Sequence, residues 1–416
     1  MRILRATQTY DARASGAGLF AVRLAEALAA AGHEVLVIAP SDRGPGYRTI
    51  RRGVRLELVR SFPLRPFTTK VRLALHARRR VEGLFEDFAP EVVHAQDHYP
   101  LGRVALEVAC HNGVPVLATN HFLPENMIPY LPVPHRSRPA VSRLLWYWVT
   151  RTYDRAALVT TPSQAGVAAI RAAGLRPPAL AVSCGVDCEF FRPLPELDRA
   201  AVRRQLNLDP DAITLLFAGR LERDKRLDVL LAALSSFDRA EDQSSGARPG
   251  VPAQLIVVGV GMDEGRWRRL TKRLGLERRV VFTGFVTRRT LLELLNSADI
   301  FAMPSEAELL SIATLEAMAV GMPILAADAR ALPELVGPGV NGELFRPGDP
   351  ADAARWLRHL CERQADWPKM AEASRRRARE HAFNGVVARY EALYRDLAAG
   401  VRGEAIQRRL LQGLET

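Results

Sequence analysis

The sequence predicts an α/β protein of two domains, each built on a doubly wound parallel sheet with helices on both faces. Short apolar runs alternate with longer helix-type segments, which is the order that parallel sheets require. The alternation occurs twice, and a proline-containing segment at residues 192–195 interrupts it. The length of 416 residues also exceeds what a single hydrophobic core usually holds.

The first half carries short, apolar strand candidates separated by helix patterns. We expect strands at residues 2–5, 35–39, 54–58, 92–94, 116–119 and 158–161, with helices for example at residues 19–31 and 101–110. The regular pattern loosens over residues 188–208. We therefore expect an N-terminal Rossmann-like domain over residues 1–193.

The second half restarts the same order of elements. We expect strands at residues 213–218, 254–258, 280–283, 299–302, 323–326 and 342–345, and helices at residues 227–234, 263–274, 289–297, 311–320 and 352–363. The polar residues 238–252 are typical of a surface insertion. The second domain is expected over residues 194–380, and the helical residues 381–416 are expected to pack back on the first domain.

The composition excludes several classes of protein. With 48% hydrophobic and 25% charged residues, the chain is typical of globular rather than disordered proteins. Four cysteines are too few for a disulfide scaffold, which favours a reducing cytoplasm. No apolar run has the length of a membrane span, and no signal-peptide core is recognised. The net charge of +12 attracts polyanions, but no nucleic-acid-binding signature accompanies it, so nucleic acid is not an expected partner.

Candidate anion-binding residues follow the first strand of each half. Gly16 and Gly18 let a ligand approach the backbone at a helix start, although a purely structural turn fits them equally well. Gly219, Arg220 and Lys225 follow the strand at residues 213–218. A guanidinium binds phosphate oxygens in pairs, and an ammonium acts as a mobile point charge. Those residues therefore suit a diphosphate, with a solvated charged loop as the competing interpretation.

Two glutamates, Glu308 and Glu316, flank and occupy a predicted helix start. Eight helical residues span about 12 Å, whereas paired glycosidase carboxyls lie within about 10 Å of each other. The two carboxylates are therefore expected to contact different parts of one long ligand, such as sugar and ribose hydroxyls. For Glu316, a helix residue with a backbone partner is the alternative.

Histidines and polar residues gather near strand ends of the first half. His94, His98 and His121 have only Asp97 as a candidate fourth ligand, so we favour hydrogen bonding over metal binding. A polar, proline-broken loop at residues 120–126 directly follows a strand. Such a loop predicts a surface that contacts the acceptor of a transfer reaction.

Taken together, these motifs resemble glycosyltransferase family 4 over nearly the whole chain. The resemblance rests on an ordered set that comprises Ser15–Gly18, Gly32-His-Glu-Val35, Thr119-Asn-His121, Ser183-Cys-Gly-Val-Asp187 with Phe191 and Pro193, Gly219-Arg220 with Lys225, Val258-Gly-Val-Gly261, Phe282-Thr-Gly-Phe-Val286, Glu308-x7-Glu316 and Gly321-Met-Pro323. The family has the GT-B fold, an α/β architecture of two Rossmann-like domains that face a central cleft.

The resemblance implies retaining transfer of a hexose from a nucleotide-activated sugar, without a metal or another cofactor. His121, Arg220, Lys225 and Glu308 would be the catalytic residues. The donor would contact Gly16, Gly18, Gly219, Arg220, Lys225, Gly259, Phe285, Val286, Glu308, Leu310, Ser311, Ile312 and Glu316. The acceptor side would comprise His98, Asn120, His121, Glu125 and Asn126.

Within that set, the two glutamates would divide the donor. Glu308 would bind sugar hydroxyls and Glu316 the ribose, while Phe285 would lie by the base. His121 would contact the sugar near its C6. Many family members have Gly-Phe-Gly where this chain has Leu309-Leu-Ser311, which leaves the identity of the sugar open.

The segments 120–126 and 308–316 look most like the diacylglycerol glucosyltransferase branch of the family. That branch implies UDP-glucose or a related UDP-hexose as donor, a lipid acceptor, and peripheral binding to the anionic inner face of the cell membrane. A transferase of the same fold that acts on phosphatidylinositol or a soluble sugar is the runner-up. A nucleotide-sugar epimerase and a non-catalytic nucleotide-sugar-binding protein are the alternatives from other classes.

Two physical features agree with a membrane surface. One is a basic cluster of Arg65, Lys70, Arg72, Arg78, Arg79 and Arg80. Each basic residue near an anionic leaflet contributes about 1 kcal/mol. The other is the aromatic segment 144–149, because tryptophan and tyrosine favour the membrane interface. A helix buried in the core is an equally good interpretation of the tryptophan pair Trp146 and Trp148.

Overall fold

A computed structural model describes residues 1–11, 15–63, 72–237 and 253–412. Residues 238–252, predicted to be a surface insertion, lie outside this set, as do Arg65 and Lys70 of the basic cluster. The chain forms two compact units. Unit 1 comprises Met1–Cys184 with Asn384–Thr416, and unit 2 comprises Gly185–Phe383.

Unit 1 contains an eight-stranded sheet in the order β10-β9-β8-β7-β1-β2-β4-β3. Its strands are β1 (Arg2–Ala6), β2 (Glu34–Pro40), β3 (Tyr47–Arg51), β4 (Val54–Val59), β7 (Val92–Ala95), β8 (Val116–Thr119), β9 (Leu158–Thr161) and β10 (Ala179–Ala181). All neighbours are parallel except β3, which pairs antiparallel with β4. A separate two-stranded sheet joins β5 (Phe62–Pro63) and β6 (Arg72–Leu73).

The edge strands β3 and β10 were missed by the sequence-based prediction. β3 carries Arg48 and Arg51 and has no buried residue, so it lacks the apolar run by which the central strands are recognised. β10 is only 3 residues long. Edge strands bury less surface than central ones, and their sequences carry a correspondingly weaker pattern.

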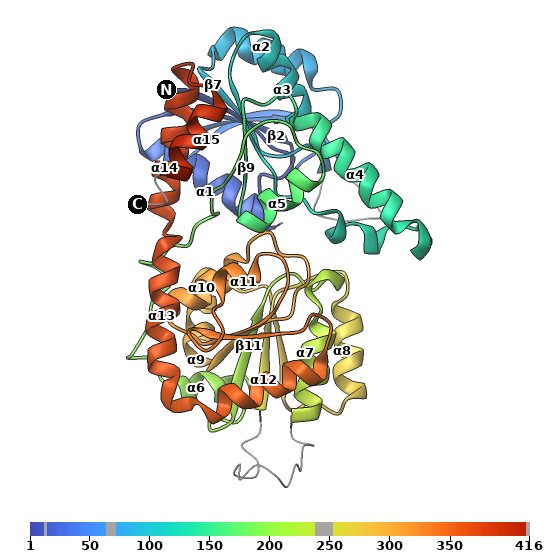
Figure 1. Ribbon diagram of the computed structural model, residues 1–416, viewed down its shortest axis with the longest axis vertical. Coiled ribbons are helices and arrows are strands. Elements are labelled where there is room, and N and C mark those ends of the chain that lie inside the picture. Colours follow the sequence, from blue (N-terminus) through green and yellow to red (C-terminus); the bar gives the residue numbers. More distant parts are fainter. Residues whose placement is uncertain (12–14, 64–71, 238–252, 413–416) are drawn as a thin grey trace. The chain divides into compact units, whose positions relative to one another are not determined.

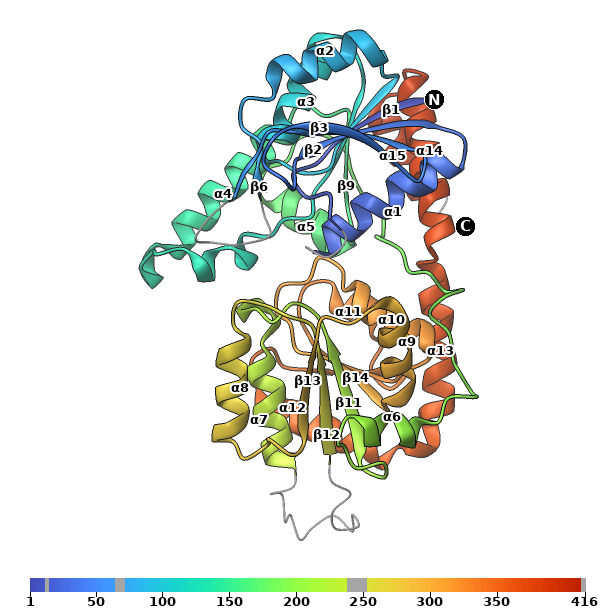
Figure 2. The same ribbon diagram turned by 180° about the vertical axis from the view of Figure 1, so that it is seen from behind.

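Helices cover both faces of this sheet (Figures 1 and 2). They are α1 (Gly16–Ala30), α2 (Arg78–Phe88), α3 (Pro100–His111), α4 (Arg138–Tyr153), α5 (Gln164–Ala172), α14 (Phe383–Ala398) and α15 (Gly403–Gln412). Three short turns of 3-10 helix, η1 (Pro124–Asn126), η2 (Ile128–Tyr130) and η3 (His135–Ser137), lead from β8 into α4. In Figure 1, α4 projects from the body of unit 1.

The C-terminal helices make specific contacts with the sheet of unit 1. The Tyr394 hydroxyl of α14 lies 2.7 Å from Nδ1 of His94 in β7. Gln407 of α15 donates to the carbonyl of Ala179 in β10 at 2.7 Å. Residues far apart in the sequence therefore belong to one core.

Unit 2 contains a six-stranded sheet in the order β13-β12-β11-β14-β15-β16, in which every neighbouring pair is parallel. The strands are β11 (Ile213–Ala218), β12 (Ala253–Val258), β13 (Val280–Gly284), β14 (Ile300–Met303), β15 (Ile324–Ala327) and β16 (Gly342–Phe345). The helices are α6 (Arg199–Gln205), α7 (Leu227–Phe237), α8 (Glu264–Arg273), α9 (Arg288–Ser297), α10 (Ile312–Val320), α11 (Leu332–Leu335), α12 (Pro350–Glu362) and α13 (Trp367–Glu380), with 3-10 turns η4 (Arg223–Lys225) and η5 (Gln364–Asp366). Each predicted strand and helix of this half is present.

The boundary between the units lies nine residues before the position expected from the prolines, at Cys184 and Gly185 instead of residues 193 and 194. Phe191 is 0% exposed and belongs to the core of unit 2. The backbone amide of Val186 donates to the carbonyl of His381 at 2.9 Å. Buried apolar side chains thus tie residues 185–193 to unit 2, because burial rather than backbone regularity determines which core a segment joins.

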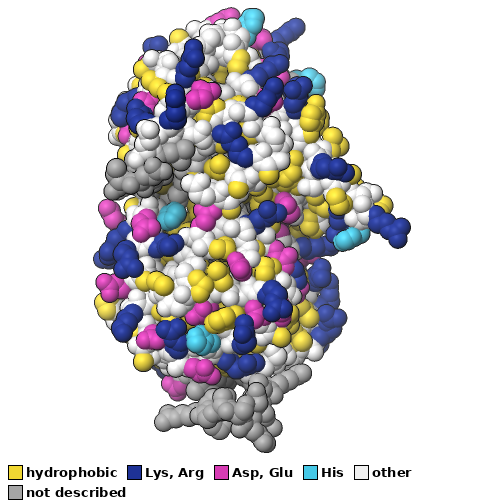
Figure 3. All heavy atoms as spheres, in the orientation of Figure 1, with side chains coloured by type: hydrophobic (Ala, Val, Ile, Leu, Met, Phe, Trp, Pro, Cys, Tyr) yellow, Lys and Arg dark blue, Asp and Glu magenta, His cyan; other side chains and the backbone are white. Residues whose placement is uncertain are grey.

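On the face visible in Figure 3, Lys and Arg side chains are interspersed with acidic ones instead of forming a single stripe. All helices in the described residues fall short of the length or apolarity that a membrane crossing demands.

Candidate functional site

The carboxyl ends of the strands in unit 2 carry most of the predicted donor residues. Because all six strands are parallel, the loops that follow them leave from the same edge of the sheet. Gly219 and Arg220 follow β11, Gly259 follows β12, Phe285 follows β13, and Glu308 lies between β14 and α10. Neighbouring strands therefore bring together residues that are up to about ninety positions apart.

Two glycines, Gly219 and Gly259, allow the loop after β11 to contact the loop after β12. Gly259 has a φ of +129°, and a Cβ built on it would lie 1.9 Å from the carbonyl oxygen of Gly219. The amide of Gly219 donates to the carbonyl of Val258 at 3.0 Å, and that of Gly259 to the carbonyl of Gly284 at 2.9 Å. The loops after three adjacent strands are thus linked through their backbones, and there is no room for a side chain at position 259.

Lys225 lies buried between two carboxylates. Its Nζ donates to Oε1 of Glu308 at 2.8 Å and lies 3.2 Å from Oδ2 of Asp224. Burial by itself lowers the pKa of Lys225, but the charges of Glu308 and Asp224 outweigh this effect and raise it. The side chain is therefore a cation at neutral pH. An ammonium has three N–H donors, so donors remain for the oxygens of a ligand.

Asp224 was not recognised as a site residue from the sequence. It is 6% exposed, and its backbone carbonyl accepts from the hydroxyl of Ser305 at 3.1 Å. It thereby ties the loop before Glu308 to the turn that carries Lys225. In the sequence it is one of several consecutive charged residues, and nothing in the sequence distinguishes it from its exposed neighbours.

Arg220 is more exposed than Lys225. Its Nη1 donates to Oε2 of Glu222 at 2.5 Å, and its side chain is 40% exposed. Burial raises the pKa of Glu222. A guanidinium held at one end, with its other donors facing solvent, remains available to an anionic ligand.

Helix α10 begins directly after Ser311, as predicted. The hydroxyl of Ser311 accepts from the amide of Thr314 at 3.2 Å and from its hydroxyl at 2.8 Å. The positive end of the helix dipole and its free amides favour an anion at this point. Leu310 and Ile312 are half-buried beside it, and Glu316 is 8% exposed within the helix.

Phe285 and Val286 differ in exposure at the end of β13. Phe285 is 58% exposed, whereas Val286 packs partly against the core of unit 2. An exposed aromatic ring next to a strand end offers a stacking surface for a flat ligand group.

The remaining predicted residues lie in unit 1. Gly16 and Gly18 begin α1, and the hydroxyl of Ser15 accepts from the amide of Gly18 at 3.1 Å. A Cβ on Gly18 would lie 2.3 Å from the carbonyl oxygen of Asp11. Gly18 is thus required by the close approach of the chain that follows β1, which supports the structural interpretation of this glycine.

Asn120 organises the loop after β8. Its side chain donates to the carbonyl of Phe122 at 3.1 Å and accepts from the amide of Phe122 at 3.3 Å, and the residue is 0% exposed. Since both ends of the amide are used within the loop, Asn120 shapes the turn that carries His121. Glu125 and Asn126 lie in η1 of the same segment, where the Oδ1 atom of Asn126 is buried without a hydrogen-bond partner among the described residues.

His98 and His121 are neutral at physiological pH. The ring of His98 packs against Tyr99 and Phe122, with centroid distances of 4.5 and 4.7 Å. Burial lowers the pKa of both histidines to about 4, and the charge of Arg5 contributes at His121. Nδ1 of His98 and Nε2 of His121 are buried and lack hydrogen-bond partners in the described part of the chain. Each offers one unused hydrogen-bonding position to a polar ligand.

His94 does not join the other two histidines in a cluster of ligands. Its Nδ1 lies 2.7 Å from the Tyr394 hydroxyl and its Nε2 lies 2.7 Å from the Thr119 hydroxyl. Both nitrogens are therefore occupied by hydrogen bonds, the role that we favoured from the sequence. Within the described ranges, no group of three or more His, Cys, Asp or Glu side chains is arranged to hold a metal ion.

Asp97 is a further residue that sequence reasoning named only in passing. Burial raises its pKa to about 6, although hydrogen bonds from the Gln8 amide, the Thr7 hydroxyl and the Tyr99 amide oppose the shift. The Thr7 hydroxyl and the Tyr99 amide each donate to it at 3.2 Å. It follows β7 at the same edge of the sheet as His98.

We expect the protein to lose stability on acidification between about pH 6.5 and about pH 4. The pKa values of His98 and His121 are about 4 in the folded protein, and that of His94 is also lowered. The unfolded chain then binds protons that the folded chain does not bind. Asp97 acts in the opposite sense, because its folded pKa is raised, and offsets part of the loss.

The net loss is expected to be roughly 3 kcal/mol at pH 4.5, and it can be measured by denaturant unfolding at pH 7.5 and pH 4.5. The variant His98→Phe, which keeps an aromatic ring in the same packing, should show a shallower dependence. The matched variant His111→Phe, on the exposed surface of α3, serves as the control. An unchanged slope in His98→Phe would contradict the assignment.

Comparison with known proteins shows the family and the fold of this chain. The sequence profile described as "Glycosyltransferase Family 4" matches residues 14–190, and the one described as "Glycosyl transferases group 1" matches residues 198–381. A relative from Catenulispora acidiphila, named D-inositol 3-phosphate glycosyltransferase 1, is 32% identical over 75% of this chain and 74% of its own length. The sulfoquinovosyl transferase SQD2 of Arabidopsis thaliana is 28% identical over 79% of this chain and 60% of its own length.

Solved structures show the same fold. Sucrose-phosphate synthase from Thermosynechococcus elongatus has a TM-score of 0.75 at 22% identity and covers 96% of this chain and 99% of its own. Anabaena HepE, solved with UDP-glucose, has a TM-score of 0.72 at 22% identity and covers 94% of this chain and 98% of its own.

The two Rossmann-like units and their matches define a glycosyltransferase of the GT-B fold that uses a nucleotide sugar. The chain belongs to glycosyltransferase family 4, as its motifs predict.

Proposed function

We propose that this enzyme transfers a hexose, with retention of anomeric configuration, from UDP-glucose or a related UDP-hexose to a membrane lipid such as 1,2-diacylglycerol. The observation that carries the donor half of this proposal is the buried contact between Lys225 and Glu308 next to the start of α10. A cation, a carboxylate and the start of a helix thus lie together at one strand edge, which is a set of groups suited to a sugar diphosphate.

The donor would bind along this edge of unit 2. Its diphosphate would contact Lys225, Arg220 and the amides of Ser311 and Ile312. Glu308 would accept hydrogen bonds from sugar hydroxyls and Glu316 from the ribose, with the base on Phe285. Anabaena HepE, which shares the fold, was solved with UDP-glucose and supports the choice of a uridine donor.

The proposed reaction needs no side chain as general base. The bond between the anomeric carbon and the donor phosphate oxygen breaks, and the acceptor oxygen attacks from the same face. The proton of the acceptor hydroxyl passes to the departing phosphate oxygen, which Lys225 and Arg220 stabilise. Because these cations take the role that a metal ion has in other transferases, we expect activity to persist in EDTA.

The lipid half of the proposal rests on helix α4 of unit 1. Leu144, Tyr147 and Trp148 are 58%, 55% and 57% exposed. The alternative of a core helix therefore applies to Trp146, which packs partly against the core, and not to Trp148. Exposed aliphatic and aromatic side chains on a helix that projects from its unit are typical of a surface that meets a membrane interface (Figure 1). Such an enzyme would act at the cytoplasmic face of the cell membrane.

The basic cluster predicted near α2 contributes less than expected to such a surface. Arg72 donates to Ser61, Arg78 to Glu107, and Arg80 to Glu57. Of the cluster members that the structure describes, only Arg79 makes no ion pair or side-chain hydrogen bond. Paired guanidinium groups attract anionic lipid weakly, because carboxylates nearby cancel their charge.

A soluble or lipid-linked inositol phosphate is the second candidate acceptor. It is favoured by the relatives named D-inositol 3-phosphate glycosyltransferase, among them the Catenulispora acidiphila protein. The relative named sulfoquinovosyl transferase is named for the sugar that it transfers, so its name favours neither acceptor. The identity of the acceptor, diacylglycerol or an inositol phosphate, therefore distinguishes the two proposals.

The experiment that tests the proposal measures nucleotide release from UDP-, GDP- and ADP-hexoses. Each donor is incubated alone, with anionic vesicles that contain diacylglycerol, and with inositol phosphate. Release that requires both UDP-hexose and the vesicles is the expected result. Release that requires inositol phosphate would replace the lipid acceptor by the second candidate, and isomerised donor without release would overturn both in favour of an epimerase.

A further inference from the structure

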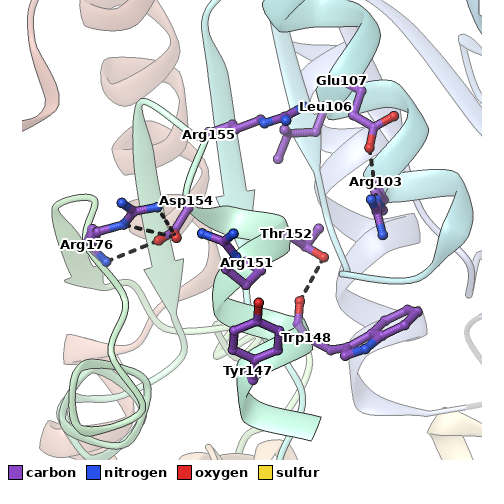
Figure 4. Close-up of a pocket in the computed structure, with 10 residues that line it drawn as sticks. All are labelled: Arg103, Leu106, Glu107, Tyr147, Trp148, Arg151, Thr152, Asp154, Arg155 and Arg176. Carbon is purple, nitrogen blue, oxygen red and sulfur yellow. Dashed lines mark hydrogen bonds and ion pairs between the residues drawn. The ribbon is translucent and has the colours of Figure 1, made fainter. Parts of the chain in front are cut away.

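Unit 1 contains a hollow, which we call the α3–α4 pocket, away from the strand edge described above. It has a volume of about 520 Å³ and is lined by Arg103, Leu106, Glu107, Tyr147, Trp148, Arg151, Thr152, Asp154, Arg155 and Arg176. Figure 4 shows these side chains around the junction of α3, α4 and the segments that precede β9 and β10. Asp154 and Arg155 lie before the amino end of β9, whereas His98 and Asn120 follow the carboxyl ends of β7 and β8. The pocket is thus distinct from the predicted acceptor residues.

The charges of the pocket do not balance. Four arginines and two carboxylates line it. Arg103 donates to Glu107 at 2.9 Å, and Arg176 donates to Asp154 at 2.5 Å, so both carboxylates are already paired. Arg151 and Arg155 make no ion pair with any residue that the structure describes. The four arginines and two carboxylates leave the lining of the pocket with an excess of two positive charges, which favours the binding of an anion.

The uncompensated arginines adjoin an apolar surface. The guanidinium of Arg151 lies 5.7 Å from the centre of the Tyr147 ring. Tyr147 and Trp148 line the pocket and are more than half exposed. Leu144, also more than half exposed, lies one turn before them on the same helix. The Thr152 hydroxyl donates a hydrogen bond to the carbonyl of Trp148 at 2.9 Å, within the same part of α4. Arg151 and the exposed apolar groups therefore share helix α4, and Arg155 follows the end of that helix.

We propose that the α3–α4 pocket binds the phosphate of an anionic phospholipid and thereby holds unit 1 on the membrane while leaving the reaction to the strand edges. Guanidinium groups bind phosphate in a bidentate manner, and aromatic rings favour the level of the lipid headgroups. The charge excess matches an anion, and the neighbouring Leu144, Tyr147 and Trp148 match acyl chains rather than a nucleic acid or a soluble anion. This inference rests on the proposed membrane acceptor only in that both require a bilayer.

The test measures binding of the full chain to phosphatidylcholine vesicles with and without phosphatidylglycerol, in the absence of donor and diacylglycerol. The double variant Arg151→Gln/Arg155→Gln should lower the affinity for the phosphatidylglycerol vesicles by at least about tenfold. The control Arg171→Gln/Arg408→Gln removes the same charge from exposed positions on α5 and α15. Its effect should stay within about threefold.

An equal loss of affinity in both double variants would overturn the proposal and indicate a diffuse attraction between the basic protein and the anionic vesicles. Unchanged vesicle binding of Arg151→Gln/Arg155→Gln would also overturn the proposal. Glycerol 3-phosphate binding that depends on Arg151 and Arg155, without a change on vesicles, would overturn the lipid assignment. The arginine variant should also keep normal turnover on a dispersed short-chain diacylglycerol. Failure of wild type on that acceptor would instead refute the proposed function and leave the vesicle result standing.

Discussion

Replacing Lys225 with alanine should lower kcat/KM for the nucleotide sugar by about three orders of magnitude. The substitution removes the cation that we assign to the donor diphosphate. It also leaves Glu308 and Asp224, which are 9% and 6% exposed, without their shared counter-charge. The two carboxylates would then repel the phosphate that Lys225 is proposed to attract. Steady-state kinetics over a range of donor concentrations measures the effect.

Two controls separate this loss from a general disturbance. Lys272→Ala removes a lysine from the exposed surface of α8 in the same unit and should leave kcat/KM unchanged. Lys225→Arg keeps the charge and should retain part of the activity. Circular dichroism should show an intact fold in all three variants. Turnover near the wild-type value in Lys225→Ala would refute the assignment of the diphosphate.

Replacing Gly259 with alanine should abolish most of the activity through the backbone alone. The new Cβ would lie 1.9 Å from the carbonyl oxygen of Gly219, and the φ of +129° disfavours any L side chain. The loop after β11 must then move, and Arg220 moves with it. We expect kcat/KM to fall by about two orders of magnitude, because misplacement of positioning groups by about 1 Å has effects of this size. Donor affinity, measured by calorimetry with UDP, should fall as well.

Gly275→Ala provides the matched control for this substitution. Gly275 also belongs to unit 2 and has a φ of +68°, but nothing lies within 4 Å of a Cβ built there. It therefore carries a positive φ, with a milder strain than at Gly259, and lacks the collision. Equal losses of donor affinity in Gly259→Ala and Gly275→Ala would show that strain, not contact between the loops, is responsible.

Much of unit 2 was predictable because its strands are buried on both faces. β11 and β16 were predicted with their observed bounds, and the other strands within one residue, since continuous apolar runs between turns are easily recognised. The exposed edge strand β3 was not predictable, because it has no such apolar run. The pairings of Arg78 with Glu107 and of Arg80 with Glu57 were not predictable either, because each joins residues more than twenty positions apart.

The candidate site also has features that the sequence predicts and features that only the structure shows. The sequence predicts Gly219, Lys225 and Glu308 as donor-binding residues, since each follows a strand and has chemistry suited to a phosphorylated sugar, and the family resemblance adds Ser311. Their mutual contacts were not. That Lys225 donates to Glu308, and that Asp224 is buried beside both, depends on how β11 and β14 adjoin in the sheet.

The order of the central strands and of the helices between them, the GT-B fold and membership of glycosyltransferase family 4 were thus determined by the sequence alone, because periodicity and motif order are local properties of the chain. The tertiary structure decided which charges are paired, which apolar side chains remain exposed, and where residues 185–193 belong. Charge pairing distinguishes Arg151 and Arg155 from Arg103 and Arg176, and exposure distinguishes Trp148 from Trp146. These properties depend on neighbours that are distant in the sequence, and only the packing of the chain brings such neighbours together.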